Sequence, residues 1–370
     1  MPGFLTFNVF VGSPFPCVRG GTTSLEGSSR LARQLEAVAA LEADVVALQE
    51  VYGGGILDAY TRHFSDTHDA LAVRQPATVL GRLSAFLLPL TVGILVGACF
   101  LLVATADDDD DVAVVVTAVG AATVVGWAVA WLLLRHSALL VFLAGDVAGA
   151  LVVLVRRGAF EVVTDAAFYP FADQNGDPMN HFRPRGFLVV NLRDRTTGDH
   201  VCVVNVHTNA LGADAHRAHQ TEAAFAVATT AKNTLAVVLG DMNANFDAAS
   251  VRCHATYQLA DAYSAHGDDG GGGATWVGTN RLSHGHMRVP DQHCDYILYA
   301  PAAGVDAEQS SCCVVFADDP TSDHLGVLAT LAPRKPCTIH SKPSASHVVA
   351  DTALVQHRIA GDYVPTSPAW

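Results

Sequence analysis

Two long apolar runs restrict how this 370-residue chain can fold. Residues 83–106 and 112–134 contain no charged side chain, and each exceeds the roughly 20 residues that a helix needs to cross a bilayer. A helix of this length in a soluble core normally keeps one polar face. The sequence therefore predicts a two-helix transmembrane hairpin over residues 83–134. A buried helical hairpin inside a soluble domain is the alternative.

The residues around this hairpin predict its orientation. Arg74, Arg82 and Arg135 flank it on the side of the main domain, and five consecutive aspartates, residues 107–111, separate its two helices. Basic flanking residues stay on the cytoplasmic side of a membrane. The eight cysteines show no paired spacing, which favours a reducing compartment. We therefore expect a multi-pass membrane protein whose main domain is cytosolic.

The rest of the chain alternates strand and helix patterns, which is typical of an α/β fold. Helical periodicity covers residues 28–43 and 214–231. We predict one discontinuous domain from residues 1–82 and 135–332, followed by a C-terminal extension over residues 333–370. Strand-like runs occupy residues 4–11, 44–50, 149–157, 186–192, 200–207, 235–241, 295–300 and 324–331.

Five of these predicted strands carry polar side chains at one end. Asp and Asn are ordinary turn formers, so a turn explains one such end, but it does not explain five. In open α/β sheets, ligands bind at one edge, where strand ends converge. The sequence therefore predicts a site at this edge. Its first members are Asn8, Gln49, Glu50, Asn205, His207, Asp241, Asn243, Ser322, Asp323 and His324.

The residue types at these strand ends restrict the chemistry. A glutamate with amides nearby suits a hard, oxygen-loving cation such as Mg²⁺. Two histidines and an aspartate suit a general base, its orienting carboxylate and a donor to developing negative charge. The chain has no GxSxG, P-loop, HExxH or GxGxxG motif. Metal-assisted attack of water on a phosphorus ester fits this set best.

Two further features bear on partners. The formal net charge of −14 counts against a non-specific nucleic-acid binder, which normally has a basic surface. Residues 283–295 are rich in histidine, but their spacing matches no common zinc site, so a surface loop is the favoured interpretation.

Six motifs carry a resemblance to a known superfamily. In chain order they are "LTFNVF", "DVVALQEV", "VVNVH", "VVLGDMNAN", "CDYILY" and "SDHLGVLA". Together they resemble the endonuclease/exonuclease/phosphatase superfamily, which implies a four-layer α/β sandwich of two mixed sheets flanked by helices. The segments "RPRGFLVVNL", "NVHTNALGADAHRAHQ" and "LGDMNAN" look most similar to neutral sphingomyelinases, although Arg185 and Asn209 stand where that group has Lys and Gln.

The resemblance implies a metal and a set of phosphoryl contacts. Glu50 corresponds to the principal ligand of Mg²⁺, for which Mn²⁺ would substitute, and Asn8 lies beside the metal. His207 and Asn243 correspond to residues that bind the phosphoryl oxygens.

The same resemblance implies the proton-transfer and substrate residues. His324 corresponds to the base that activates water, and Asp241 to a residue that assists protonation of the leaving group. Asp323 and Asp295 correspond to supporting acids. Arg185 and Asn209 stand at positions that contact the substrate headgroup.

Three functions from different classes follow. The first is a membrane-anchored, Mg²⁺-dependent phosphodiesterase that hydrolyses a phospholipid such as sphingomyelin to a lipid and a phosphorylated headgroup. The second is a nuclease or phosphoinositide phosphatase of the same superfamily. The third is a catalytically silent membrane scaffold. We expect the first, with a membrane phospholipid as substrate, the bilayer as partner through residues 83–134, and no stable nucleic-acid partner.

Overall fold

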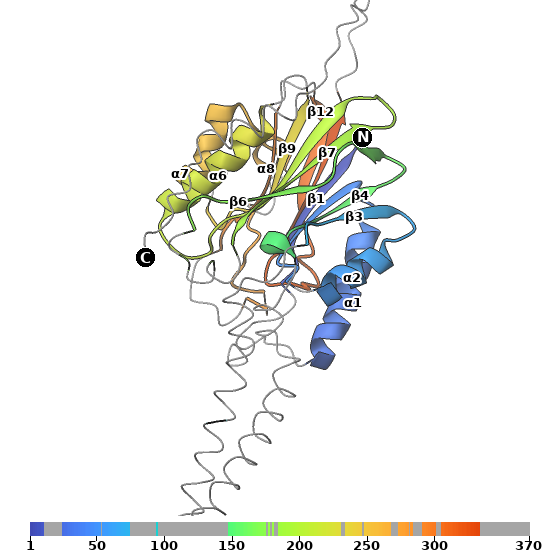
Figure 1. The fold of residues 1–370 in the computed structure, drawn as a ribbon, viewed down its shortest axis with the longest axis vertical. Helices are drawn as coiled ribbons and strands as arrows, with labels where there is room; N and C mark the ends of the chain where they lie inside the picture. The colour runs from blue at the N-terminus through green and yellow to red at the C-terminus, as the bar shows by residue number, and fades with distance from the viewer. Residues whose placement is uncertain are drawn as a thin grey trace, which may run out of the picture.

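A computed structural model gives the fold of the main domain (Figure 1). Apart from Ile94, the predicted hairpin over residues 83–134 lies outside the described residues, as does the C-terminal extension after Pro333. Within the described part of the chain, no helix has the length and apolar character needed to cross a membrane. The transmembrane hairpin therefore stays a prediction. The structure describes residues 1–10, 24–52, 54–74, 94, 147–174, 177, 180, 184–230, 234–245, 248–267, 273–280, 282–283, 291–300 and 305–333.

The first sheet contains both termini of the described fold. Its strand order is β12-β13-β1-β2-β4-β3, and only the β1–β2 pair among these neighbours is parallel. Its strands are β1 (Gly3–Asn8), β2 (Val45–Gln49), β3 (His68–Leu71), β4 (Val152–Arg156), β12 (Val305–Val315) and β13 (Gly326–Pro333).

The second sheet has the order β10-β11-β9-β8-β7-β5, with β6 also paired to β7. The β8–β9 pair is parallel and the other pairs are antiparallel, so this sheet is also mixed. Its strands are β5 (Phe160–Val162), β6 (Ala167–Pro170), β7 (Gly186–Asp194), β8 (His200–His207), β9 (Leu235–Asp241), β10 (Ala260–Asp261) and β11 (Asp295–Tyr299).

Helices cover the outer faces of the two sheets (Figure 1). The first sheet is covered by α1 (Ser24–Ala40) and α2 (Gly54–His63). The second is covered by α6 (Asp214–Ala228) and α7 (Ala249–Arg252). The short elements are α8 (Ala262–His266), η1 (Ala148–Ala150) and η3 (Cys253–Tyr257). The predicted α/β sandwich of two mixed sheets flanked by helices agrees with this arrangement.

Three apolar layers follow from strands that are buried on both faces. On β2, Val45 and Ala47 pack between the sheets, whereas Val46 and Leu48 pack under α1 and α2. A strand that is covered on both faces has no polar side, so its sequence is almost continuously apolar. This is why the runs over residues 44–50 and 235–241 indicate central strands.

Two buried side-chain amides connect the two sheets at the end of β2. Gln49 Nε2 donates to Asn205 Oδ1 at 2.8 Å. Asn205 Nδ2 donates to the carbonyl oxygens of Leu48 and Val152, each at 3.0 Å. Both amides are fully buried, and a buried polar group without partners is costly, so this network specifies how the two sheets align.

The structure corrects several predicted boundaries. The strand β3 has only four residues and a weak apolar pattern, and the sequence did not indicate it. Residues 83–134 therefore lie between β3 and β4, because the predicted strand over residues 149–157 is β4. The helix predicted to begin at Ser28 begins at Ser24.

Candidate active site

The polar strand ends meet because of strand direction. The parallel pairs β1–β2 and β8–β9 present their carboxyl ends at one edge, where Asn8 lies opposite Gln49 and His207 lies opposite Asp241. The antiparallel strand β11 begins at the same edge, with Asp295 opposite Asp241. His324 precedes β13, which is antiparallel to β1. The predicted convergence of these ends is observed.

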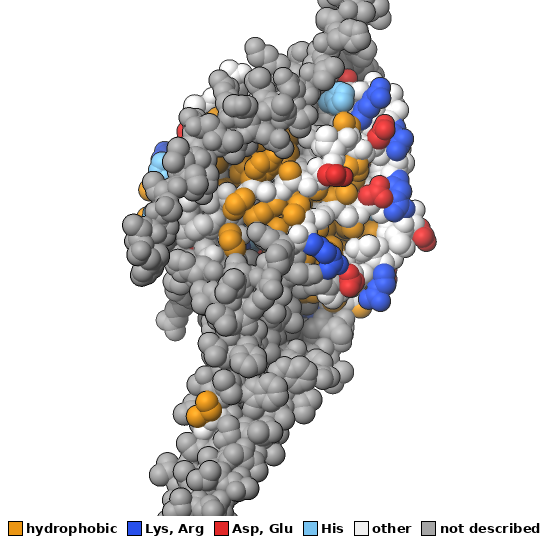
Figure 2. Space-filling model, viewed as in Figure 1, with side chains coloured by type: hydrophobic (Ala, Val, Ile, Leu, Met, Phe, Trp, Pro, Cys, Tyr) orange, Lys and Arg blue, Asp and Glu red, His pale blue; other side chains and the backbone are white. Residues whose placement is uncertain are grey.

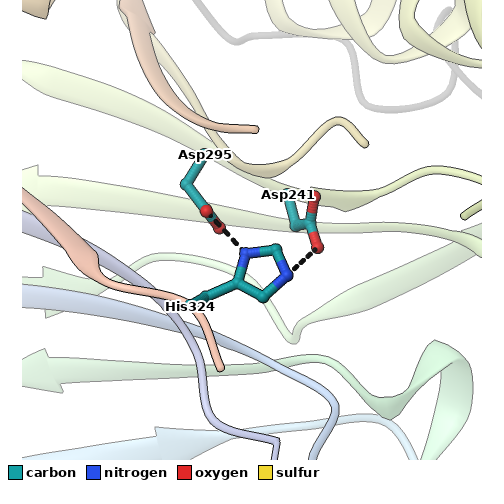
Figure 3. Close-up of side chains that lie close together, drawn as sticks. All are labelled: Asp241, Asp295 and His324. Atoms are coloured by element: carbon teal, nitrogen blue, oxygen red, sulfur yellow. Dashed lines mark hydrogen bonds and ion pairs between the residues drawn. The ribbon is translucent and has the colours of Figure 1, made fainter. Parts of the chain in front are cut away.

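One imidazole lies between two carboxylates (Figure 3). His324 Nδ1 donates to Asp295 Oδ2 at 2.8 Å, and His324 Nε2 lies 3.7 Å from Asp241 Oδ2. Burial opposes the charged form of the ring, but Asp295 and Asp241 outweigh it and hold the pKa of His324 well above its usual value. The hydrogen bond to Asp295 also fixes the orientation of the ring, and the tautomer of its neutral form, so that Nε2 faces the site.

Thr275 holds Asp295 and the chain next to His324 together, and the sequence did not indicate this role. Its side-chain oxygen accepts from the backbone nitrogens of Cys294 at 3.0 Å and Asp295 at 3.1 Å. Its carbonyl oxygen accepts from the nitrogen of Leu325 at 2.7 Å. Thr275 therefore positions both the acid and the histidine. A threonine after a glycine-rich run gives little signal because its partners lie far along the chain.

Asp241 is oriented from two sides. Asn8 Nδ2 donates to its Oδ2 at 2.9 Å, and the nitrogen of Asn243 donates to its Oδ1 at 2.8 Å. The preceding Gly240 has φ +149°, and a Cβ atom there would lie 1.9 Å from the carbonyl oxygen of Val206. Only glycine permits this close approach of β9 to β8. The "GD" pair in the sequence thus has a steric reason as well as a chemical one.

A second imidazole also lies close to Asp241. His207 Nε2 is 3.6 Å from Asp241 Oδ2 and 3.9 Å from Glu50 Oε1. The guanidinium of Arg185 contacts the ring of His207. Burial, then the charge of Arg185, lowers the pKa of His207 well below its usual value, so this ring is neutral at neutral pH.

Glu50 has an unusual backbone for a non-glycine residue. Its φ of +63° lies in the left-handed region, directly after β2. Such strain costs on the order of 1–3 kcal/mol and is commonly kept at functional sites. Burial is the largest cause that raises the pKa of Glu50 to about 7; Asp323 and Asp241 raise it further, and Arg185 opposes them. The strained turn thus places a carboxylate among other acids.

The profile of the Endonuclease/Exonuclease/phosphatase family matches residues 5–324. The chain belongs to this family. The superfamily predicted from the sequence is confirmed, whereas the closer likeness to neutral sphingomyelinases stays a prediction. Members of the family are metal-dependent hydrolases of phosphoric esters.

Solved structures share the fold at low sequence identity. An endonuclease/exonuclease/phosphatase from Bacteroides vulgatus is 18% identical, with a TM-score of 0.54 over 90% of this chain and 99% of that chain. The mannosyl-6-phosphatase Bt3783 of Bacteroides thetaiotaomicron is 13% identical, with a TM-score of 0.55 over 90% of this chain and 100% of that chain. At these identities the likeness shows the fold alone. No match was found among curated proteins.

TDP2 from D. rerio, solved with a single-strand DNA product, is a third structure with this fold. It is 13% identical, with a TM-score of 0.52, and the match covers 89% of this chain and 98% of that chain.

The oxygen and nitrogen atoms of the site are suited to hold a divalent cation. Ligand atoms of Asp241, Asp295 and His324 lie within 4.8 Å of one another, but His324 Nδ1 is already bonded to Asp295. The oxygen-rich side of the site holds Glu50 and Asn8, near Asp241. Burial raises the pKa of Glu50 most and the charges of Asp323 and Asp241 add to it, and a cation among these oxygens would stabilise the charged carboxylate. Glu50 and Asn8 therefore remain the residues that would hold the metal.

Two predicted residues have different surroundings. Asp323 lies beside Ser322, whose hydroxyl donates to Asp323 Oδ1 at 3.2 Å, and its charge reaches Glu50. Asn209 is fully buried, and its Oδ1 accepts from Asn180 at 2.8 Å and from Gln220 at 2.9 Å. This placement does not support direct contact between Asn209 and substrate, because the amide is engaged inside the protein.

Proposed function

We propose that this protein is a divalent-cation-dependent hydrolase that cleaves a phosphoric ester of a membrane phospholipid, with sphingomyelin as the first substrate to test. The observation that carries the hydrolytic part is the Asp295–His324–Asp241 arrangement opposite Glu50 and His207. Hydrolysis of a phosphoric ester needs a positioned base, a means of protonating the leaving group and stabilisation of negative charge. This edge of the sandwich offers residues for each.

Each side chain has a role that follows from its contacts. Asp295 holds Nδ1 of His324, and Nε2 takes the proton of the attacking water when the ring is in its neutral form. In the cation-free protein the raised pKa of His324 keeps this ring protonated at neutral pH, and the positive charge of a cation bound nearby would favour the neutral form. A cation held by Glu50 and Asn8 would supply Lewis-acid polarisation of the phosphoryl group. Neutral His207 and charged Arg185 provide N–H donors for the phosphoryl oxygens.

The position of the apolar insertion supports a lipid substrate. The chain leaves the described fold after Arg74 and re-enters at Val147, and these two residues form an antiparallel bridge. The nitrogen of Val51, beside Glu50, donates to the carbonyl oxygen of Ala150 at 3.0 Å. The insertion therefore begins and ends at the same edge as the site. If its apolar runs enter a bilayer, the site faces lipid headgroups at high effective concentration.

A nuclease or a phosphatase is the second candidate. Its support is the fold shared with TDP2, solved with a DNA product, and with a mannosyl-6-phosphatase. The net charge of −14 disfavours a polynucleotide substrate. Figure 2 shows basic and acidic side chains next to one another along one edge of the molecule. Ion pairs such as Arg156–Asp44 and Arg157–Asp69 partly neutralise such basic groups. A strong basic surface for phosphates is a usual mark of nucleic-acid binding.

A substrate panel tests the proposal. The full-length protein in detergent is assayed with Mg²⁺ on sphingomyelin and other phospholipids, single-stranded DNA, RNA and sugar phosphates. We expect release of a phosphorylated headgroup from lipid, loss of activity with excess chelator, and loss in His324→Ala. His200→Ala is the matched control, because His200 is exposed at the opposite end of β8. DNA cleavage that depends on His324, with lipids untouched, would overturn the lipid assignment.

A further inference from the structure

A polar groove lies directly beside the residues described above. It has a volume of about 480 Å³, which is within the usual range for small-ligand sites. Its walls come from the first turn of α6, the segment after β9, the end of α7 and the residue range before β11. Its polar and charged lining residues are Asp214, Arg217, Asn243, Asn245, Arg252 and Gln292.

The groove is continuous with the candidate active site through Asn243. The backbone nitrogen of Asn243 holds Asp241, and its Nδ2 donates to the carbonyl oxygen of Thr208 at 3.2 Å. The same residue lines the groove. A substrate with its scissile phosphate near Asp241 and Asn243 therefore has the groove immediately next to it.

Two guanidinium groups supply positive charge to this groove. Arg217 donates through Nη1 to the carbonyl oxygen of Gly212 at 3.2 Å, and its Nε lies 3.7 Å from Asp214 Oδ1, beyond hydrogen-bond distance. That Nε is buried and has no hydrogen-bond partner among the described residues. Arg252 lies exposed at the end of α7. Guanidinium groups bind phosphate with paired N–H donors, so both side chains suit an anion in this groove.

The amides of the groove add further donors. Asn245 Oδ1 accepts from the nitrogen of His293 at 3.1 Å, and Gln292 Oε1 accepts from Cys294 Sγ at 3.5 Å. These two amides keep their nitrogens as donors, whereas the nitrogen of Asn243 is engaged by Thr208 and the carboxylate of Asp214 also lines the groove. The two arginines and these two amides can therefore donate to a group that only accepts hydrogen bonds.

We propose that this groove binds a second phosphate of the substrate, carried beyond the scissile ester, through Arg217 and Arg252. The proposal rests on the proposed function and narrows its substrate, because sphingomyelin carries only one phosphate and would leave this groove without its ligand. The second phosphate belongs either to a phosphorylated lipid headgroup or to a soluble nucleotide. Both sources present the same chemistry to the two arginines.

Two substrate pairs distinguish these sources. One is phosphatidylinositol and its monophosphate in mixed micelles, and the other is adenosine monophosphate and adenosine bisphosphate. The selectivity is the ratio of kcat/KM with the second phosphate to kcat/KM without it. We expect a ratio of about ten or more in one pair for the unmodified protein, and a ratio near one in Arg252→Gln. Arg193→Gln, an exposed arginine on β7, is the control and should keep the ratio.

A ratio near one in the unmodified protein, or an unchanged ratio in Arg252→Gln, would overturn the subsite. Failure to hydrolyse either pair while sphingomyelin is cleaved would also count against the subsite, whereas failure on sphingomyelin and on both pairs would count against the proposed function. In that case calorimetry with inositol monophosphate and inositol bisphosphate still tests the groove. Tighter binding of the bisphosphate by about tenfold, lost in Arg252→Gln, supports it, and equal binding of the two compounds contradicts it.

Discussion

The two imidazoles of the site are both buried, yet they differ in charge. His207 contacts the cation of Arg185, and its pKa lies well below the usual value. His324 lies between Asp295 and Asp241, and its pKa lies well above the usual value. Burial alone lowers the pKa of both rings, so the difference comes from the neighbouring charges. The site therefore has one side suited to donate to negative charge and another suited to proton transfer.

The largest effect is expected at Glu50, where the two sides meet. Glu50→Gln should lower kcat on the order of 10²–10³-fold, as expected when a principal electrostatic group is lost, and weaken binding of the divalent cation. Steady-state kinetics over a Mg²⁺ titration measures both quantities. Full activity of this variant at low Mg²⁺ would remove Glu50 from the metal site.

The same variant has a stability consequence with a defined sign. In the cation-free protein, burial raises the pKa of Glu50 from 4.5 to about 7, so its contribution to stability is present at low pH and is lost as the pH rises through about 7. Glu50→Gln removes this titration. We expect the free energy of unfolding to fall less between about pH 5 and pH 8 in the variant than in the unmodified protein, measured by denaturant titration with chelator present.

Asp295→Asn tests why the pKa of His324 is raised. Asp295 is the carboxylate that raises the pKa of His324 most, so removing its charge should lower that pKa towards its usual range. Loss of the fixed tautomer should reduce kcat by roughly 100-fold or more. Histidine NMR titration measures the pKa, and the pKa of His207 should shift slightly upward, since the charge of His324 is one of the causes that lower the pKa of His207. An unchanged His324 titration would mean that Asp295 does not set its charge.

Arg185→Gln tests why the pKa of His207 is lowered. Removing this cation should raise the pKa of His207 and reduce kcat/KM by about tenfold, since a donor to the phosphoryl oxygens is lost. Arg157→Gln is the matched control, because Arg157 is exposed in an ion pair with Asp69 and should change the free energy of unfolding by at most about 1 kcal/mol. A His207 titration that matches the unmodified protein would contradict the assigned cause.

Thr275→Val should have the smallest effect on chemistry and a clear effect on stability. The isosteric side chain cannot accept from the nitrogens of Cys294 and Asp295, which costs about 1–3 kcal/mol in the free energy of unfolding. We expect a fall in kcat with little change in KM, because Asp295 and His324 lose alignment while the substrate contacts remain. Chemical denaturation and steady-state kinetics together separate these effects, and a pure KM change would contradict the positioning role.

The sequence alone determined the class of fold and most of the site. Continuous apolar runs with polar ends identified β2, β8 and β9, because strands that are buried on both faces have no alternating pattern. Motif order then indicated the superfamily, and the predicted Asn8, Glu50, His207, Asp241 and His324 do lie at one edge. Local signals are strong here because chemistry and burial change over a single residue at each strand end.

Only the tertiary structure decided what each polar group meets. Asn209 has the residue type of a substrate contact, but Asn180 and Gln220 engage it inside the protein. Thr275 is an ordinary threonine in sequence, yet it holds Asp295 through a bond that spans 20 residues of chain. The opposite pKa shifts of His207 and His324 likewise depend on strands that are distant in sequence. Hydrogen bonds and charges act over a few ångströms, so they are set by how the sheets pack, whereas a sequence records only which groups are available.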